Sequence, residues 1–375
     1  MSTRTRFRSR AALLLALLAQ AGCVTNPPPR ETSAQLETSL DARVPELLAR
    51  YRIASVSVAL IDNGKLVLER AYGEQSVGVP ATTATLFNLA SLTKPVSAEV
   101  LLRLISSGQL SLDEPMAALW TDPDVASDPR LAQLTLRTAL SHQTGLPNWR
   151  GQSPNGKLAF TFTPGTAYGY SGEGYNYAAR YAERKSGADF EELARRLVFR
   201  RLGMNNTSFT YRDWMRGRLA VPLDERGHWA QPQTEAPGQP NAANNLITTA
   251  GDYALFVASV MRGESLNRQL AAERLQPVRG PQPARACELA AKEACPRKSS
   301  VVFGWNRLDF EDGPVFMHTG SNGRAGGERT LAWFDPGRRR GIVILTSGTE
   351  GERLYREIAW IMDPGSRLAR YLGSH

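Results

Sequence analysis

The feature that most constrains the fold of this chain is the distribution of its strand-like and helix-like segments. Residues 54–61 and 65–71 are strand-like runs joined by Asp62-Asn63-Gly64, a pattern typical of a β-hairpin. Further strand-like runs lie near the other end, at residues 300–308, 315–318, 330–334 and 341–346. Between them the chain shows mostly helical patterns and long loops. We therefore expect an α+β fold in which both ends build one sheet and a mostly helical subdomain is inserted at about residues 110–250.

The N-terminus has the pattern of an export signal. Residues 1–22 combine four arginines with a short leucine-rich run, which predicts a signal peptide too short to span a bilayer comfortably. Cys23 follows small residues, as in a bacterial lipobox, and this predicts a lipoprotein anchored to the membrane; an ordinary cleaved signal is the alternative. We expect residues 23–39 to be a tether, 40–365 the folded domain and 366–375 a tail. Either signal exports the protein to the cell envelope or periplasm.

The composition is that of a soluble globular enzyme. Hydrophobic residues make up 42% of the chain and charged residues 22%. The formal net charge is +9, but no basic stripe is interleaved with aromatic residues, so we expect no nucleic-acid partner. The triplet Arg338-Arg339-Arg340 lies between two strand-like runs and predicts a solvated hairpin tip.

Two cysteines remain besides Cys23. Cys287 and Cys295 could close a small loop as a disulfide in an oxidising compartment; two free thiols are the alternative. Neither cysteine has the spacing of a metal site, and the chain has only four histidines. We expect no metal and no organic cofactor.

Ser91 and Lys94 stand three residues apart in Asn88-Leu89-Ala90-Ser91-Leu92-Thr93-Lys94. The apolar residues that follow recur at helical spacing up to Gly108, so both side chains would lie on one side of a first helical turn. A serine hydroxyl becomes a nucleophile when a base takes its proton, and a partly desolvated lysine can be that base. The alternative is that Ser91 is a helix N-cap and Lys94 a solvated residue of the first turn.

Several further motifs follow in a recognisable order. They are the sequences LSHQTGLP at 140–147, PGTAYGYSGEGY at 164–175, LGM at 202–204, LITTAGD at 246–252 and HTG at 318–320. Together with the Ser91 motif they resemble the serine β-lactamase and D-alanyl-D-alanine carboxypeptidase family, on the branch of class C β-lactamases and related esterases. The resemblance runs from about residue 40 to about 362. It implies a β-lactamase/transpeptidase-like fold, with an antiparallel sheet flanked by helices, and a serine hydrolase that forms an acyl-enzyme.

The resemblance also implies a role for each site residue. Ser91 would be the nucleophile, Lys94 would hold and tune its proton, and Tyr170 would be the general base, with Tyr168 as a rival. An ordinary tyrosine has a pKa near 10, so this role needs a positive charge nearby, such as Lys94. The N–H groups of Ser91 and Ser321 would form the oxyanion hole. Substrate binding and oxyanion stabilisation are together assigned to His318, Thr319, Gly320 and Ser321.

Two residues depart from the family's pattern. Gly172 stands where the family has an asparagine, whose amide usually contacts the lysine and the substrate, and His318 stands where it often has a lysine. We expect both changes to shift the substrate toward esters, although a β-lactam, a D-Ala-D-Ala peptide from peptidoglycan and a short ester all stay open. The alternative function is a penicillin-binding-like envelope module that is acylated without turnover. His142 is expected to be structural.

Overall fold

The computed structural model describes residues 31–283, 294–323 and 327–373. Its α-helices are α1 (Ser33–Tyr51), α2 (Thr93–Ser106), α3 (Leu136–Leu140), α4 (Gly172–Ser186), α5 (Phe190–Ala194), α6 (Arg200–Leu202), α7 (Ala250–Arg262), α8 (Arg268–Glu273), α9 (Gly351–Met362) and α10 (Arg367–Gly373). Short 3-10 turns are η1 (Ala90–Leu92), η2 (Met116–Ala118), η3 (Pro123–Val125), η4 (Pro129–Gln133), η5 (Arg150–Gln152) and η7 (Asp213–Met215), and η6 (Arg195–Phe199) is a π-helical turn. The strands are β1 (Ser55–Asp62), β2 (Lys65–Ser76), β3 (Val79–Pro80), β4 (Phe87–Asn88), β5 (Ile247–Thr248), β6 (Lys298–Val302), β7 (Trp305–Phe310), β8 (Gly313–Ser321), β9 (Glu328–Asp335) and β10 (Arg340–Ser347).

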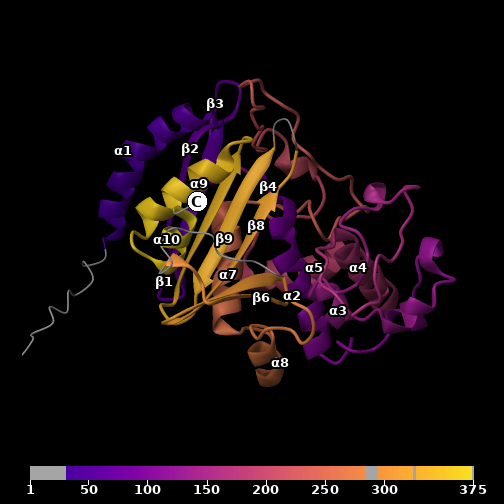
Figure 1. Cartoon of the computed structure of the whole chain (residues 1–375). Coiled ribbons are helices and arrows are strands. Elements are labelled where there is room, and N and C mark those ends of the chain that lie inside the picture. The colour runs from indigo at the N-terminus through magenta and orange to yellow at the C-terminus, as the bar shows by residue number, and fades with distance from the viewer. Residues whose placement is uncertain (1–30, 284–293, 324–326, 374–375) are drawn as a thin grey trace, which may run out of the picture.

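The main sheet joins the two ends of the chain. Its eight strands lie in the order β3-β2-β1-β10-β9-β8-β7-β6, and every neighbouring pair is antiparallel (Figure 1). The junction is the pairing of β1 with β10, in which Val56 lies opposite Thr346 and Ile61 opposite Gly341. The expected α+β fold, with one sheet built from both ends, is confirmed.

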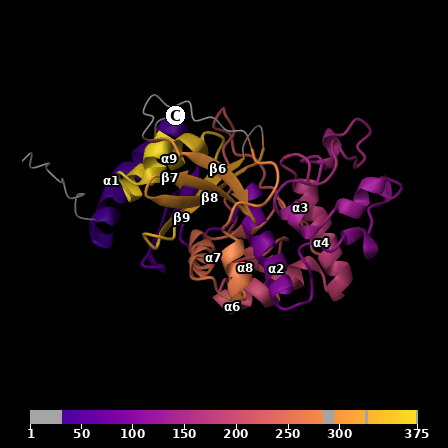
Figure 2. The same ribbon diagram turned by 60° about the horizontal axis from the view of Figure 1, so that its bottom comes forward.

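Helices cover both faces of this sheet. Alternate residues of β1 point to opposite sides: Val56, Val58 and Leu60 pack in one hydrophobic cluster with α1, α9 and α10, while Ala59 and Ile61 pack in the other with α2 and α7. Figure 2 shows α1 and α9 on one side of the strands and α7 and α2 on the other, with α3 and α4 farther out. The chain between α2 and α7 forms helices, 3-10 turns, long loops and strand β5, which pairs with β4 from just before the Ser91 turn.

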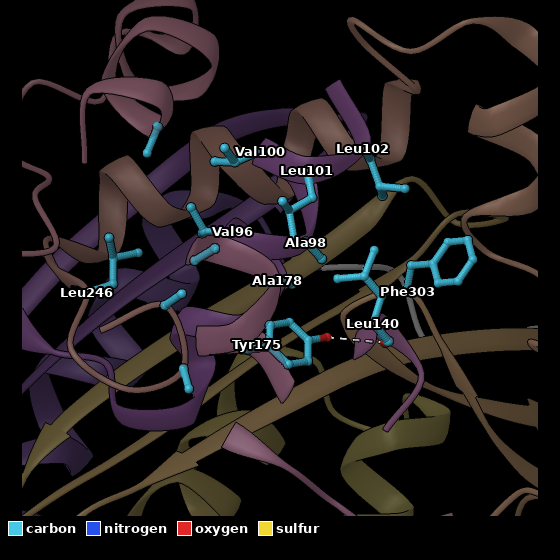
Figure 3. Packing of buried hydrophobic residues seen from close by; sticks show 14 of the residues in the cluster. Val96, Ala98, Val100, Leu101, Leu102, Leu140, Tyr175, Ala178, Leu246 and Phe303 are labelled. Carbon is cyan, nitrogen blue, oxygen red and sulfur yellow. Dashed lines mark hydrogen bonds between the residues drawn. The ribbon is translucent and has the colours of Figure 1, made fainter. Parts of the chain in front are cut away.

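Helix α2 is buried on all sides, whereas its sequence predicts a helix with one apolar face. Every residue from Thr93 to Leu104 is buried. Figure 3 shows Val96, Ala98, Val100, Leu101 and Leu102 of this helix in one cluster with side chains from distant segments, among them Leu140, Tyr175 and Phe303. A fully enclosed helix is a rigid base for the residues at its N-terminus, where Ser91 and Lys94 lie.

The first hairpin forms as its sequence predicts. Asn63 and Gly64 join β1 to β2 with φ angles of 49° and 74°. Two successive residues with positive φ are what a two-residue type I′ turn requires, and Asn-Gly meets that requirement at low conformational cost.

Both ends of the folded domain extend beyond the expected boundaries of 40 and 365. Residues 23–39 were expected to be a tether, but α1 begins at Ser33, capped by Thr32 and Gln35, and buries Leu36. Residues 366–375 were expected to be a tail, but α10 buries Leu368 and Leu372 against the same cluster as α9. A short amphipathic helix at a chain end is easily taken for a tail, because what orders it is packing against distant residues.

Two expectations near the C-terminal strands need correction. Residues 300–308 are not one strand, because Gly304, at φ 81°, turns the chain between β6 and β7. The arginine triplet is only in part a solvated tip. Arg338 and Arg339 lie in the turn between β9 and β10, and Arg339 is exposed, but Arg340 begins β10, is buried at 6% exposure, and forms ion pairs with Asp62 and Asp363. Arg338 also contacts Asp363, so acidic partners far along the chain hold two of the three arginines in place.

Cys295 is disulfide-bonded; its predicted partner Cys287 and the predicted lipidation site Cys23 both lie outside the described residues. Among the helices that the structure describes, none combines the length and the hydropathy needed to cross a bilayer.

Candidate active site

Ser91 lies in a tight turn between β4 and α2. Ala90 just before it has a φ of 48°, a left-handed conformation that costs a residue with a side chain about 1–2 kcal/mol. Two hydrogen bonds hold this turn: the Ala90 N–H donates to Asn88 Oδ1 at 2.7 Å, and Thr93 Oγ1 donates to the Ala90 carbonyl at 2.6 Å. The serine hydroxyl caps neither η1 nor α2, so the N-cap alternative does not hold.

The Lys94 amine is completely buried beside that hydroxyl. Its Nζ lies 3.1 Å from Ser91 Oγ and donates to the Ala243 carbonyl at 2.8 Å. Burial lowers the pKa of Lys94 from 10.5 to about 7, because the charged ammonium is poorly solvated there. The other alternative, a solvated lysine, is therefore also wrong. A neutral amine can keep one N–H on Ala243 and turn its lone pair toward the serine hydroxyl.

Tyr170 is the tyrosine that the structure places beside this amine. Lys94 Nζ lies 4.7 Å from the centroid of its ring. The Tyr170 ring is half-buried and also lies against His142, with ring centroids 4.3 Å apart. Tyr168 meets the same histidine edge-on at 6.2 Å. The structure thus brings together Ser91, Lys94 and Tyr170, and the Tyr170 ring lies against the buried lysine.

His142 orders the loop that carries Tyr170. It has a φ of 58°, and its Nδ1 accepts the N–H of Ser171 at 3.1 Å. Burial lowers the pKa of His142 well below its usual value, and nearby Lys94 adds to the effect. A neutral ring that accepts at Nδ1 carries its proton on Nε2. This contact agrees with the structural role expected for His142.

Strand β8 closes the other side of the site. A Cβ atom on Gly320 would lie 2.1 Å from the Leu89 carbonyl oxygen and 2.3 Å from Thr330 Oγ1, so only glycine allows the strand to approach the nucleophile turn. Thr330 Oγ1 donates to the same Leu89 carbonyl at 2.9 Å, which ties β9 to this turn.

The remaining residues of the HTG motif differ in their exposure. His318 is buried, its ring centroid 6.5 Å from that of Tyr170, and its Nδ1 donates to the Thr319 carbonyl at 2.8 Å. Thr319 is half-buried and Ser321 is exposed. The pairing of β8 with β7 ends at Met317, whereas its pairing with β9 continues to Ser321. The last residues of β8 therefore extend past the end of β7, and the oxyanion role of Ser321 stays a prediction.

Two contributors to the site were missed in the sequence. The Ala243 carbonyl that holds Lys94 is a backbone group, and no residue type marks it. Trp149 follows the LSHQTGLP motif by two positions, and Lys94 Nζ lies 5.7 Å from the centroid of its indole ring. Its place just after a recognised site loop was a usable signal. Within the described ranges, no group of three or more His, Cys, Asp or Glu side chains is arranged to hold a metal ion.

Comparison with known proteins identifies the family of this chain. The family model described as Beta-lactamase matches residues 40–363. This protein belongs to the beta-lactamase family. It is similar to a solved class C beta-lactamase at a TM-score of 0.70, with 18% identity over 88% of this chain and 96% of that chain. The expected β-lactamase/transpeptidase-like fold is thereby confirmed.

Curated relatives in this beta-lactamase family differ in what they are named for. Esterase EstB of Burkholderia gladioli is 28% identical over 53% of this chain and 62% of its own length. Unguisins hydrolase ungD of Aspergillus violaceofuscus is 23% identical over 86% of this chain and 63% of its own length. The chain thus spans slightly less than two thirds of each of these relatives.

Proposed function

We propose that this protein is an exported serine hydrolase that is acylated at Ser91 and hydrolyses an ester or amide carbonyl. The observation that carries the proposal is the buried Lys94 amine, with its pKa near 7, within 3.1 Å of the Ser91 hydroxyl. An amine that is partly neutral at physiological pH and in contact with a serine can take the serine's proton. Membership of the beta-lactamase family and the similarity to an esterase support the same chemistry.

The reaction would proceed in two steps. Ser91 Oγ attacks the carbonyl carbon as its proton passes to the Lys94–Tyr170 pair, and the tetrahedral oxyanion is stabilised by backbone N–H groups at Ser91 and Ser321. The leaving alcohol or amine departs with the proton that the pair held. Water then attacks the acyl carbon and gives its proton to the same pair. The bond between Ser91 Oγ and the acyl carbon breaks, the acid product is released, and the pair returns the proton to Ser91 Oγ.

Labelling of the nucleophile tests this mechanism. We expect a fluorophosphonate probe to add one label per protein on Ser91, as seen by intact mass and peptide mapping, and Ser91→Ala to remove both the label and turnover. Turnover is compared on nitrocefin, a D-Ala-D-Ala peptide and p-nitrophenyl butyrate. A long-lived adduct with no turnover on any of them would instead support the acylated binding module.

Export and anchoring form a separate part of the proposal, supported by the sequence of residues 1–23. We expect the full-length protein to fractionate with membranes and Cys23→Ser to release it. If Cys23→Ser leaves the protein in the membrane fraction, the lipid anchor is wrong while the hydrolase chemistry stands.

A further inference from the structure

The indole ring of Trp149 occupies the space that a side chain at position 172 would need. A Cβ atom on Gly172 would lie 2.9 Å and 3.0 Å from Cζ3 and Cη2 of the Trp149 indole ring, and 2.8 Å from the Asn148 carbonyl oxygen. Contacts that short are not tolerated in a packed protein, so one side must move. Gly172 at the start of α4 and the indole of Trp149 are therefore a matched pair, in which the ring occupies the space of a side chain.

The backbone on both sides of Trp149 is held by the N-terminus of α4. Before it, the carbonyl and Oδ1 of Asn148 accept the N–H of Gly172 at 3.1 Å and 3.0 Å, and the same carbonyl accepts from Glu173 at 3.2 Å. After it, the Arg150 N–H donates to Glu173 Oε1 at 2.9 Å. Free N–H groups at a helix start are natural partners for such acceptors. The ring is consequently carried by a fixed loop.

This ring forms an apolar surface beside the reacting atoms. It is half-buried, and its centroid lies 5.7 Å from the Lys94 amine that contacts Ser91. Position 172 contributes no polar group to the same surface, because it has no side chain and its N–H is already bound to Asn148. A substrate group that packs here meets an aromatic face, which favours flat or apolar groups and leaves an amide without a partner at position 172.

We propose that Trp149 is the wall against which the acyl group of the substrate packs, and that the enzyme selects esters of aromatic or other apolar acids. This inference rests on the proposed acyl-enzyme chemistry. The acyl group is the part concerned because it stays bonded to Ser91 after the alcohol has left, next to the lysine that the ring contacts. A fixed aromatic wall then holds it during both steps.

Selectivity within one series of esters tests the proposal. The substrates are p-nitrophenyl acetate, butyrate and phenylacetate, which share a leaving group and differ only in the acyl part. We expect Trp149→Ala to lower kcat/KM for phenylacetate about 10- to 100-fold more than it lowers kcat/KM for acetate, the value of one lost aromatic contact. Trp149→Phe should recover most of the loss. Trp360→Ala, which removes a half-exposed tryptophan from α9, is the matched control and should leave the selectivity unchanged.

A second variant addresses the pairing of ring and glycine. Gly172→Ala should reduce the selectivity for phenylacetate in the natural background, because its Cβ displaces the ring. Once Trp149 is Ala, only the contact with the Asn148 carbonyl remains, and the selectivity should change little further. Additive effects of the two substitutions would overturn the pairing. Circular dichroism and thermal melts establish that each variant is folded before its selectivity is compared.

Each remaining outcome separates this inference from the proposed function. If Trp149→Ala lowers activity on all three esters equally, the ring acts on Lys94 and not on the acyl group, and the inference is wrong. If hydrolysis of acetate depends on Ser91 but selectivity survives Trp149→Ala, the inference alone fails. If Ser91→Ala still hydrolyses acetate at the natural rate, the acyl-enzyme proposal itself fails.

Discussion

Lys94 is the residue whose titration most directly tests the proposed chemistry. Burial lowers its pKa to about 7, so about nine in ten amines are neutral at pH 8 and about one in ten at pH 6. If the neutral amine takes part in removing the Ser91 proton, the acylation rate should fall about tenfold from pH 8 to pH 6.

The substitution Lys94→Arg separates this titration from other groups. A guanidinium stays protonated throughout the range, so acylation should drop by about 10²- to 10⁴-fold and lose its dependence on pH between 6 and 8. The assay is stopped-flow release of p-nitrophenol from p-nitrophenyl butyrate under single-turnover conditions, read at the wavelength where p-nitrophenol and its anion absorb equally. Lys185→Arg, on the outer surface of α4, is the control and should keep the natural profile. A Lys94→Arg protein that still titrates with a midpoint near 7 would refute the assignment.

Three further predictions concern buried groups around the site. Burial raises the pKa of Glu328 from 4.5 to about 7. The stability that the protonated Glu328 side chain contributes is therefore fully present below pH 4.5 and is lost as pH rises through 7. Glu328→Gln should make the protein more stable above pH 7 by about 3 kcal/mol. Glu99 pairs with Arg103 at 2.9 Å and with Arg274 at 2.6 Å inside the core, and Glu99→Ala should cost about 3–5 kcal/mol. Gly320→Ala should abolish acylation, because its Cβ would overlap a carbonyl of the nucleophile turn.

Their measurements and controls are simple. Urea unfolding at pH 5 and pH 8 compares Glu328→Gln with the natural protein, and equal stabilities at pH 8 would contradict the reasoning. For Glu99→Ala the control is Glu352→Ala, which removes an exposed helical pair and should cost under about 1 kcal/mol. Fluorophosphonate labelling reads out Gly320→Ala, and a normal labelling rate would show that the strand can move away from the turn.

The fold class and the closeness of Ser91 to Lys94 follow from local sequence patterns. Strand-like runs at both ends have few ways to bury their apolar faces other than in one common sheet, and the Asn63-Gly64 turn is specified locally by φ angles that few residues adopt. The spacing of Ser91 and Lys94 likewise fixes their proximity, because a helical turn brings residues three apart to one side. Such features depend on neighbours in the chain, so a pattern can reveal them.

The pKa of Lys94 and the shape of the site depend on how distant segments pack around them. The lowered pKa of Lys94 comes from the enclosure of α2 by segments far along the chain, and the Ala243 carbonyl that binds its amine is 149 positions away. The same holds at Gly172. In the sequence, the absence of an asparagine there suggests a lost contact with the substrate, whereas in the structure Trp149 fills the space of that side chain. Desolvation and steric exclusion depend on every group that surrounds an atom, and that surrounding exists only once the chain has folded.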